Sequence, residues 1–145
     1  MAYGQGGAIA AQSGVLPSNR EFGFFWEGLA EGQLLIQVCD ECGLWRCPPG
    51  PACERCSSLS WSLCAPCGEG VVHSFAVHHH PPIPPYQLPH LVVLADMKEG
   101  FRLMAHLADV APAAVKVGQA VRVEIGTFEH PFAMFRFRAG EDASS

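Results

Sequence analysis

The chain has 145 residues, of which 49% are hydrophobic and 16% are charged, and its formal net charge at pH 7 is −5. This length allows one domain, or two very small domains that share a core. The negative charge argues against a protein that grips phosphate backbones. The low content of charged residues indicates an apolar surface that is buried against a partner.

The sequence predicts a cytoplasmic protein. Residues 1–16 contain no basic residue and no apolar run long enough for a secretory signal. No stretch approaches the ~20 apolar residues that a membrane span needs. We therefore expect no membrane association. The seven cysteines are an odd number, and cysteines without a secretory signal indicate a reducing compartment.

The first two segments are predicted to be a flexible arm and an amphipathic helix. Residues 1–16 are rich in Gly, Ala and Gln and show no periodicity. Residues 17–33 are predicted to be helical, because Ser18 and Glu21 form a capping box and Gly32 is placed to end the helix. The apolar face of this helix consists of Phe22, Phe25, Trp26 and Leu29. Two interpretations stay open: these side chains pack on their own domain, or they bind another subunit.

Residues 34–69 carry the most informative motif, two Cys-x-x-Cys pairs separated by ten residues. The four cysteines are Cys39, Cys42, Cys53 and Cys56. Two such pairs present four thiolates to one Zn²⁺ at about 2.3 Å, and the small residue after each pair, Gly43 or Ser57, permits a tight turn. The spacing predicts a structural zinc ribbon, whose closed Cys₄ site leaves no open position for catalysis. Disulfides and unligated thiols are the alternatives.

The other cysteines of the chain are Cys47, Cys64 and Cys67. Cys64 and Cys67 form a further Cys-x-x-Cys pair, and its seven-residue gap from Cys56 would let it compete for the metal. A reactive thiol needs a nearby cation or helix N-terminus, and no cation adjoins this pair in the sequence. Burial is the favoured interpretation, with a second metal site or a disulfide as alternatives. Arg46 and Arg55 flank the ribbon, where two cations would offset the negative charge of a Zn(Cys)₄ centre.

Residues 70–140 are predicted to form a small antiparallel β domain. Five segments alternate between apolar and polar residues with the period of a strand. These segments lie at residues 71–79, 91–97, 101–107, 121–125 and 134–138. Glu99-Gly100 is predicted to be a tight turn, and residues 107–116 have room for a short helix. These features favour a five-stranded Greek-key barrel of the OB type, followed by a disordered tail at residues 141–145.

The order of these motifs resembles the DUF35 family. The matching segments, all within residues 22–128, are Phe25-Trp26, Leu29, Cys39–Gly43, Pro48-Pro49, Cys53–Cys56, Trp61 and Gly68–Phe75. The resemblance implies a rubredoxin-like zinc ribbon joined to an acyl-CoA-associated OB-fold, and it places the metal ligands at the first two Cys-x-x-Cys pairs. The departures are Cys47, where the family often has an aromatic residue, and the additional pair Cys64 and Cys67.

The resemblance also implies a non-catalytic subunit of a thiolase-superfamily enzyme. Such enzymes carry out thiolysis, retro-aldol cleavage or acyl transfer of acyl-CoA esters, and the larger chain supplies the catalytic cysteine. A subunit of the benzoylsuccinyl-CoA thiolase type and a subunit of a steroid side-chain aldolase both fit. We therefore expect a hetero-oligomer with structural Zn²⁺, no catalytic residue in this chain, and a coenzyme A ester at or near the interface.

Three residues are candidates for binding that ester. Residues 78–86 contain three consecutive histidines and four prolines and end in Tyr86. This stiff loop either forms a rim for a partner or acyl group or merely connects two strands, and a metal role for its histidines is less favoured. Arg102 and Arg122 lie on predicted polar strand faces, where cations would suit the phosphates of coenzyme A. A solvated face is the alternative for both.

Two rival functions fit the sequence less well. A nucleic-acid-binding zinc-ribbon and OB-fold protein needs a basic groove with exposed aromatic side chains, but Phe101, Phe135 and Phe137 are predicted on the core side of their strands. A free-standing enzyme needs a nucleophile with a base, a phosphate loop or an open metal site, and the sequence shows none of these.

Overall fold

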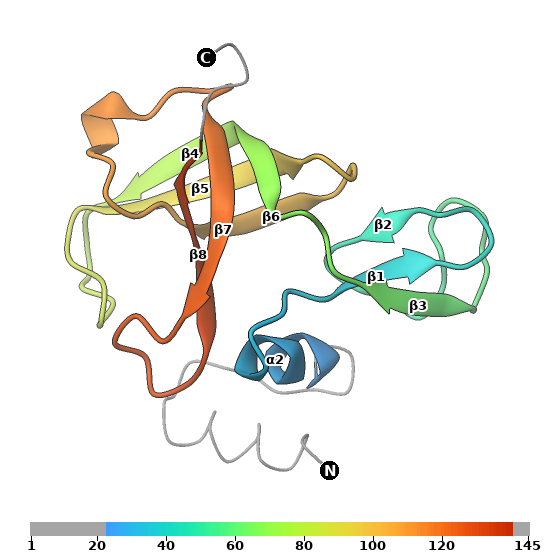
Figure 1. The fold of residues 1–145 in the computed structure, drawn as a ribbon. Coiled ribbons are helices and arrows are strands. Elements are labelled where there is room, and N and C mark those ends of the chain that lie inside the picture. The colour runs from blue at the N-terminus through green and yellow to red at the C-terminus, as the bar shows by residue number, and fades with distance from the viewer. Residues whose placement is uncertain (1–22, 141–145) are drawn as a thin grey trace. The chain divides into compact units, whose positions relative to one another are not determined.

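The computed structural model describes residues 23–140 (Figure 1). Contacts divide this part of the chain into two units. The ribbon unit comprises residues 23–66 and 125–134, and the barrel unit comprises residues 67–124 and 135–140. The predicted fold class is confirmed, because an N-terminal helix and a ribbon of short strands precede a five-stranded antiparallel barrel. No helix in the described part is long and apolar enough to span a membrane.

Helix α2 spans Gly23–Ala30, inside the predicted range 17–33. Phe25 and Leu29 of its apolar face are buried, and Trp26 is partly exposed. The rings of Trp26 and Phe25 meet edge to face with centroids 5.1 Å apart. The helix therefore packs at least half of its predicted apolar face onto its own unit. The predictions for Ser18, Glu21, Phe22, the arm at residues 1–16 and the tail at residues 141–145 fall outside the described residues.

The helix ends at the glycine that the sequence indicates. Gly32 has φ +80° and donates its N–H to the Leu29 carbonyl at 3.0 Å, while Gln33 donates to the Gly28 carbonyl at 2.8 Å. These two bonds form a Schellman motif, which needs a left-handed residue after the helix. Glycine adopts that conformation without strain.

Three short antiparallel strands form the sheet of the ribbon unit. They are β1 (Ile36–Cys39), β2 (Trp45–Arg46) and β3 (Trp61–Cys64), in the order β2-β1-β3. The apolar run at residues 34–38, which leads into the first cysteine pair, predicts a strand and accounts for β1 only. Strand β2 has two residues, too few to show a period. In β3 and the residues just before it, serine alternates with larger apolar residues. This pattern is typical of a strand and could have predicted β3.

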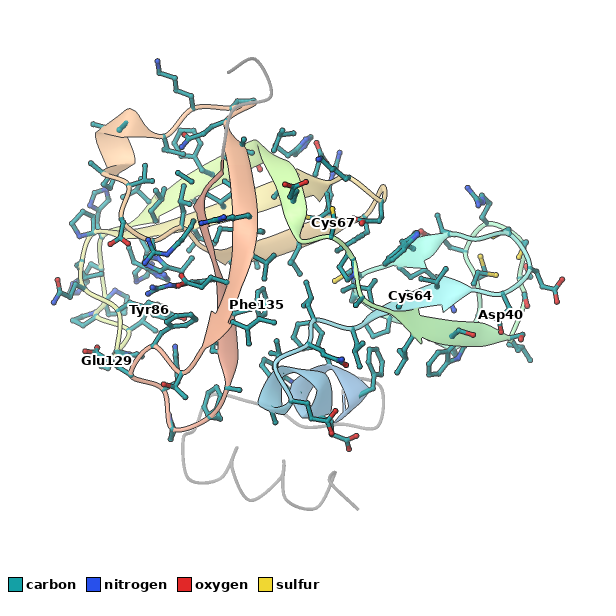
Figure 2. The ribbon with its side chains drawn as sticks, viewed as in Figure 1. Asp40, Cys64, Cys67, Tyr86, Glu129 and Phe135 are labelled. Atoms are coloured by element: carbon teal, nitrogen blue, oxygen red, sulfur yellow. The ribbon has the colours of Figure 1, made fainter. Side chains whose placement is uncertain are left out.

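The two faces of β3 differ in chemistry. On one face, the Ser60 and Ser62 hydroxyls donate to the Asp40 carboxylate at 2.6 and 2.5 Å (Figure 2). On the other face, Leu59, Trp61 and Leu63 are 74%, 40% and 37% exposed. Since β3 is an edge strand, this unit carries an apolar stripe along one border of its sheet.

The barrel sheet contains the five predicted strands. They are β4 (Glu69–His78), β5 (His90–Met97), β6 (Arg102–His106), β7 (Ala120–Gly126) and β8 (Met134–Ala139), in the order β6-β5-β4-β7-β8. A parallel bridge between Leu107 and Phe137 links the two ends of this order, and the Ala108 N–H donates to the Phe137 carbonyl at 2.9 Å. This closure produces the Greek-key barrel expected of an OB-fold.

Alternating side chains fill the barrel. The fully buried members include Val72, Leu91, Val93, Leu107, Val121 and Phe137. Burial of each such side chain contributes about 1.5–3 kcal/mol. Gly100, at φ +97°, closes the predicted turn between β5 and β6, and the predicted helix between β6 and β7 is a single 3₁₀ turn, Pro112–Ala114. Pro112 and the Gly118 turn leave too few residues for a longer helix.

Candidate metal centre

The first Cys-x-x-Cys pair sits in a turn that follows β1. The Cys39 N–H donates to the Leu44 carbonyl at 2.9 Å, and the Gly43 N–H donates to the Cys39 carbonyl at 3.0 Å. Gly43 has φ +75°, so this position favours glycine. The turn points the backbone amides that follow Cys39 toward the cysteine sulfurs.

The second pair repeats this geometry without a flanking strand. The Cys53 N–H donates to the Ser58 carbonyl and the Ser57 N–H donates to the Cys53 carbonyl, both at 2.8 Å. Ser57 takes the place of Gly43 and has φ +65°. The small residue predicted after each pair is therefore the residue that adopts the left-handed conformation.

The two turns bring the four predicted cysteines together. The sulfurs of Cys39, Cys42, Cys53 and Cys56 all lie within 4.8 Å of one another. The Cys39–Cys56 and Cys42–Cys53 separations are 3.6 and 3.5 Å, against about 3.8 Å for a tetrahedron with Zn–S distances of 2.3 Å. Within residues 23–140, no other group of three or more such ligands converges in this way. The cluster fits a structural Zn²⁺.

Backbone amides and mutual repulsion set the protonation of these thiols. The Leu44 amide lowers the pKa of Cys42 to about 6, and the Cys42 amide lowers the pKa of Cys39. At Cys56 the Ser58 amide acts in the same direction, but burial and the three neighbouring thiols raise its pKa to about 12. Four thiolates this close need a cation among them, which Zn²⁺ would supply on binding.

The two arginines that flank the ribbon have different environments. Arg55 donates to the Cys42 carbonyl at 2.6 Å. Its pKa is raised by the Cys42 side chain, first through a hydrogen bond to the thiolate and then through the thiolate's charge. Arg55 is therefore placed to offset the charge of the thiolates. Arg46 is buried instead, and its three guanidinium nitrogens have no hydrogen-bond partner. The expectation that a cation offsets the thiolate charge is supported for Arg55 and stays a prediction for Arg46.

The three remaining cysteines are not part of this cluster. Cys47 is partly buried, and this burial raises the pKa of its thiol to about 11. Cys64 ends β3, and Cys67 is exposed at the start of the barrel unit. No cation adjoins Cys67 in the sequence, but the fold brings Lys98 near it: Glu69 raises the pKa of Lys98 and the charge of Cys67 adds to the effect.

Comparisons with known proteins agree with this architecture. A family model of the ChsH2 rubredoxin-like zinc ribbon domain matches residues 26–62, and one of the ChsH2 C-terminal OB-fold domain matches residues 65–126. A solved chain described as "Ltp2-ChsH2(DUF35) aldolase" is 34% identical with a TM-score of 0.79, over 86% of this chain and 98% of that one. The chain belongs to the DUF35 family.

Two curated relatives are longer proteins. A probable enoyl-CoA hydratase alpha subunit of Thermomonospora curvata is 39% identical over 103 residues, which are 71% of this chain and 32% of the relative. A 3-oxo-4,17-pregnadiene-20-carboxyl-CoA hydratase alpha subunit of Mycobacterium tuberculosis is 36% identical over 105 residues, 72% of this chain and 33% of the relative. The chain thus spans about a third of the length of these relatives.

The candidate ester-binding residues of this DUF35 protein lie on separate parts of the barrel unit. Tyr86 is half-buried on the loop between β4 and β5 (Figure 2). Arg102 on β6 donates to Asp96 at 2.8 Å and is more than half exposed. Arg122 on β7 is exposed opposite Glu69 on β4. Their role in binding an ester stays a prediction.

Sequence reasoning missed two histidines that meet Tyr86. His90 lies under the tyrosine ring, with centroids 4.1 Å apart and an angle of 13° between planes, and His106 lies 5.2 Å from the same ring. The two histidines are sixteen positions apart in the sequence and meet because β5 pairs with β6. Alternation places each on a strand face, but it does not fix the register between strands.

Proposed function

We propose that this chain is a non-catalytic accessory subunit that binds and stabilises an acyl-CoA-processing enzyme of the thiolase superfamily. The observation that carries the proposal is the match over 98% of the length of a ChsH2(DUF35) chain, which is described together with Ltp2 as an aldolase. The closed cysteine cluster supports it, because four thiolates would saturate a tetrahedral Zn²⁺ and leave no position for substrate. The cytoplasmic location stays a prediction.

Retro-aldol cleavage suits the relatives better than thiolysis does. One relative is described as an aldolase and two are described as CoA hydratase subunits. Hydration of an enoyl-CoA places a hydroxyl group on the β-carbon, and a β-hydroxyacyl-CoA is the compound that a retro-aldol reaction cleaves. The larger partner chain would supply the reacting groups for that step.

The test of the proposal is reconstitution. The chain is co-expressed with its candidate thiolase-superfamily partner, sought among the neighbouring genes, and the complex is assayed for cleavage of β-hydroxyacyl-CoA and for thiolysis of β-ketoacyl-CoA. The partner should bind this chain stably, and turnover should need both chains. Replacement of Cys47, Cys64 and Cys67 by Ser should leave turnover within a few-fold of wild type. Loss of turnover in an assembled, zinc-loaded triple variant would mean that this chain takes part in catalysis directly.

The helix face at Phe22, Phe25, Trp26 and Leu29 is proposed to contact the partner. Trp26 is the described member with exposed surface, so Trp26→Ala is the informative change. Trp61→Ala is a matched control on β3 of the same unit, where the ring is 40% exposed. Size-exclusion chromatography with the partner should show weaker assembly for Trp26→Ala and unchanged assembly for Trp61→Ala. Weaker assembly for Trp61→Ala alone would move the contact to β3.

A contribution to the CoA-ester site is proposed for Tyr86, Arg102 and Arg122. Arg122 is the simplest to test because it is exposed. In the assembled enzyme Arg122→Ala should raise KM for the CoA ester about tenfold with kcat unchanged, since a charge-assisted hydrogen bond contributes about 1.5 kcal/mol or more. Lys116→Ala, which removes another exposed cation, serves as the control. Equal KM values for the two variants would remove Arg122 from the site.

Binding of nucleic acid finds less support. Phe101 and Phe137 are buried in the barrel, as predicted, whereas Phe135 is only partly buried. Arg136 and Arg138 both donate to Glu124, at 2.9 and 2.7 Å. These rings and cations are therefore engaged within the chain rather than arranged as a basic, aromatic groove.

A further inference from the structure

A cluster of rings covers part of the outer face of the barrel. Tyr86 stacks on His90, and His106 completes the group with its ring centroid 4.8 Å from that of His90. His78, which is paired with His90 across β4 and β5, lies 6.5 Å from it. The next residue, Leu91, points into the barrel core, so the histidines occupy the opposite face of the sheet.

The loop that carries Tyr86 is held over this face. Residues 79–89, here called the proline strap, connect β4 to β5 and contain five prolines, which have no N–H to offer to the sheet. The Tyr86 N–H donates to the Ile83 carbonyl at 2.9 Å, which closes a turn that presents the tyrosine. His78 Nε2 anchors the start of the strap by donating to the Pro81 carbonyl at 2.6 Å.

The position of the strap matters because of the fold. OB-folds bind ligands on the face of their second and third strands, next to the loop that joins the first strand to the second. In this barrel those elements are β5, β6 and the proline strap. With Tyr86 stacked on His90 and close to His106, the strap covers part of the face that this fold offers to ligands.

The ring under Tyr86 is poorly placed to carry a charge. His90 is only 7% exposed, and its buried Nε2 has no hydrogen-bond partner. A neutral imidazole tolerates this position and gains from stacking. A protonated imidazole would bring an unpaired N–H and a positive charge into the same place, which is costly. His106 Nδ1 lies 3.1 Å from the Leu91 carbonyl and donates to it.

We propose that the proline strap is an acid-released cover of the β5–β6 face. The strap lies on this face while His90 and His106 are neutral, and it leaves when they take up protons. Release would expose the two imidazoles and the strand face beneath them to a ligand or partner. This device belongs to the barrel itself and does not depend on the accessory-subunit role.

The charges around the cluster act mainly in the same direction. Burial lowers the pKa of His90, and the charges of His106 and His78 lower it further. Burial also lowers the pKa of His106, and the charge of Arg136 on β8 adds to this effect. The hydrogen bond to the Leu91 carbonyl and the charge of Asp109 after β6 oppose it without reversing it. Both pKa values lie below the ordinary 6.5. The closed strap is therefore most stable above pH 6.5 and loses stability as the pH falls below this value. For each unit by which a closed-state pKa lies below 6.5, acidification should raise the equilibrium constant for opening by about tenfold.

Fluorine NMR can follow the strap in the full-length, zinc-loaded protein. The chain has two tyrosines, so a Tyr3→Phe background labelled with 3-fluorotyrosine reports Tyr86 alone. Between pH 8 and 5.5 the Tyr86 signal should move to a solvent-exposed environment, with a midpoint below 6.5. In the H90F/H106F variant, which keeps rings beneath the tyrosine, the signal should stay at its high-pH position. His73→Phe, at an exposed histidine paired with Asp96, should behave as the background does.

Three results would overturn the proposal: a Tyr86 signal that is independent of pH, an H90F/H106F variant that switches like its background, or loss of the switch in His73→Phe. A second measurement applies if the double variant does not fold. In Tyr86→Ala the imidazole signals of His90 and His106 should titrate closer to pH 6.5 than in wild type, because the covering ring is gone. Unchanged titration midpoints would contradict the proposal equally.

Discussion

The ribbon unit and the barrel unit are stabilised in different ways. In the barrel unit, apolar side chains from five strands fill a common interior, among them Val93 and Phe137, which have no exposed surface. In the ribbon unit, two cysteine turns repeat one hydrogen-bond pattern around four sulfurs, and the edge strand β3 is exposed along most of its length. Apolar packing would hold the barrel without a ligand, whereas the cysteine turns depend on a cation between them.

Removal of a cysteine ligand should have the largest effect. Cys39→Ser or Cys53→Ser should lower zinc from about one per chain to near zero and unfold the ribbon unit, because structural Zn²⁺ contributes about 10–16 kcal/mol of apparent binding free energy in zinc-finger peptides. Metal analysis gives the zinc content, and NMR amide dispersion shows which unit has unfolded. Cys64→Ser and Cys67→Ser are the controls, and loss of zinc from these variants instead would move the ligand assignment to the third cysteine pair.

Truncation of a side chain in the barrel core should have an intermediate effect. It should destabilise the barrel unit and leave the zinc site of the ribbon unit intact. Phe137→Ala removes a ring with no exposed surface and should lower the free energy of unfolding by about 3–5 kcal/mol, with the zinc content unchanged. Denaturant titration of the zinc-loaded protein measures this. Met104→Ala, at a side chain that is 63% exposed, should change stability by about 0.5 kcal/mol or less. Loss of zinc from Phe137→Ala would show that the units do not fold separately.

A smaller effect is expected at the cation beside the thiolates. Arg55→Ala removes the donor to the Cys42 carbonyl and should weaken zinc binding by about tenfold, the low end of what partners of metal ligands contribute. Competition with a chromophoric chelator provides the affinity. Arg55→Lys keeps the charge and should recover part of the loss. Identical affinities for all three proteins would mean that the hydrogen bond of Arg55 has no influence on the metal.

The smallest effect distinguishes the two cysteine turns from each other. Ser57 holds the left-handed conformation that Gly43 holds in the first turn, and a residue with a Cβ is strained there by about 1–2 kcal/mol. Ser57→Gly should therefore stabilise the zinc-loaded ribbon by up to about 1 kcal/mol, because added freedom of the unfolded chain offsets part of the gain. Slower zinc transfer to a chelator would register this gain. A destabilised variant would indicate that the Ser57 side chain has a role of its own.

The sequence predicted the features whose determinants are consecutive in the chain. Each cysteine turn consists of six neighbouring residues, so spacing and the following Gly43 or Ser57 were enough to indicate it. The barrel strands were recognised for a similar reason, since alternation is a local property. The spacing of its apolar residues and the glycine at position 32 predicted helix α2.

Features that depend on strand pairing were not predictable in the same way. The stack of Tyr86 on His90, next to His106, needs both the β5–β6 register and the path of the proline strap. Register follows from packing of the whole sheet, and one residue of slip would move His106 to the other face. The proximity of Lys98 to Cys67 likewise arises from the fold rather than from neighbouring positions.

The exposed border of β3 has a consequence for how this protein is made in the cell. Residues 57–66 contain no charged residue, and β3 presents both an open backbone edge and the stripe of Leu59, Trp61 and Leu63. Edge strands without charges or other protection tend to pair with further copies of themselves. A chain synthesised at a high level should therefore accumulate partly as aggregates. The yield of soluble protein should fall as the amount of chain rises, because pairing between copies increases with concentration.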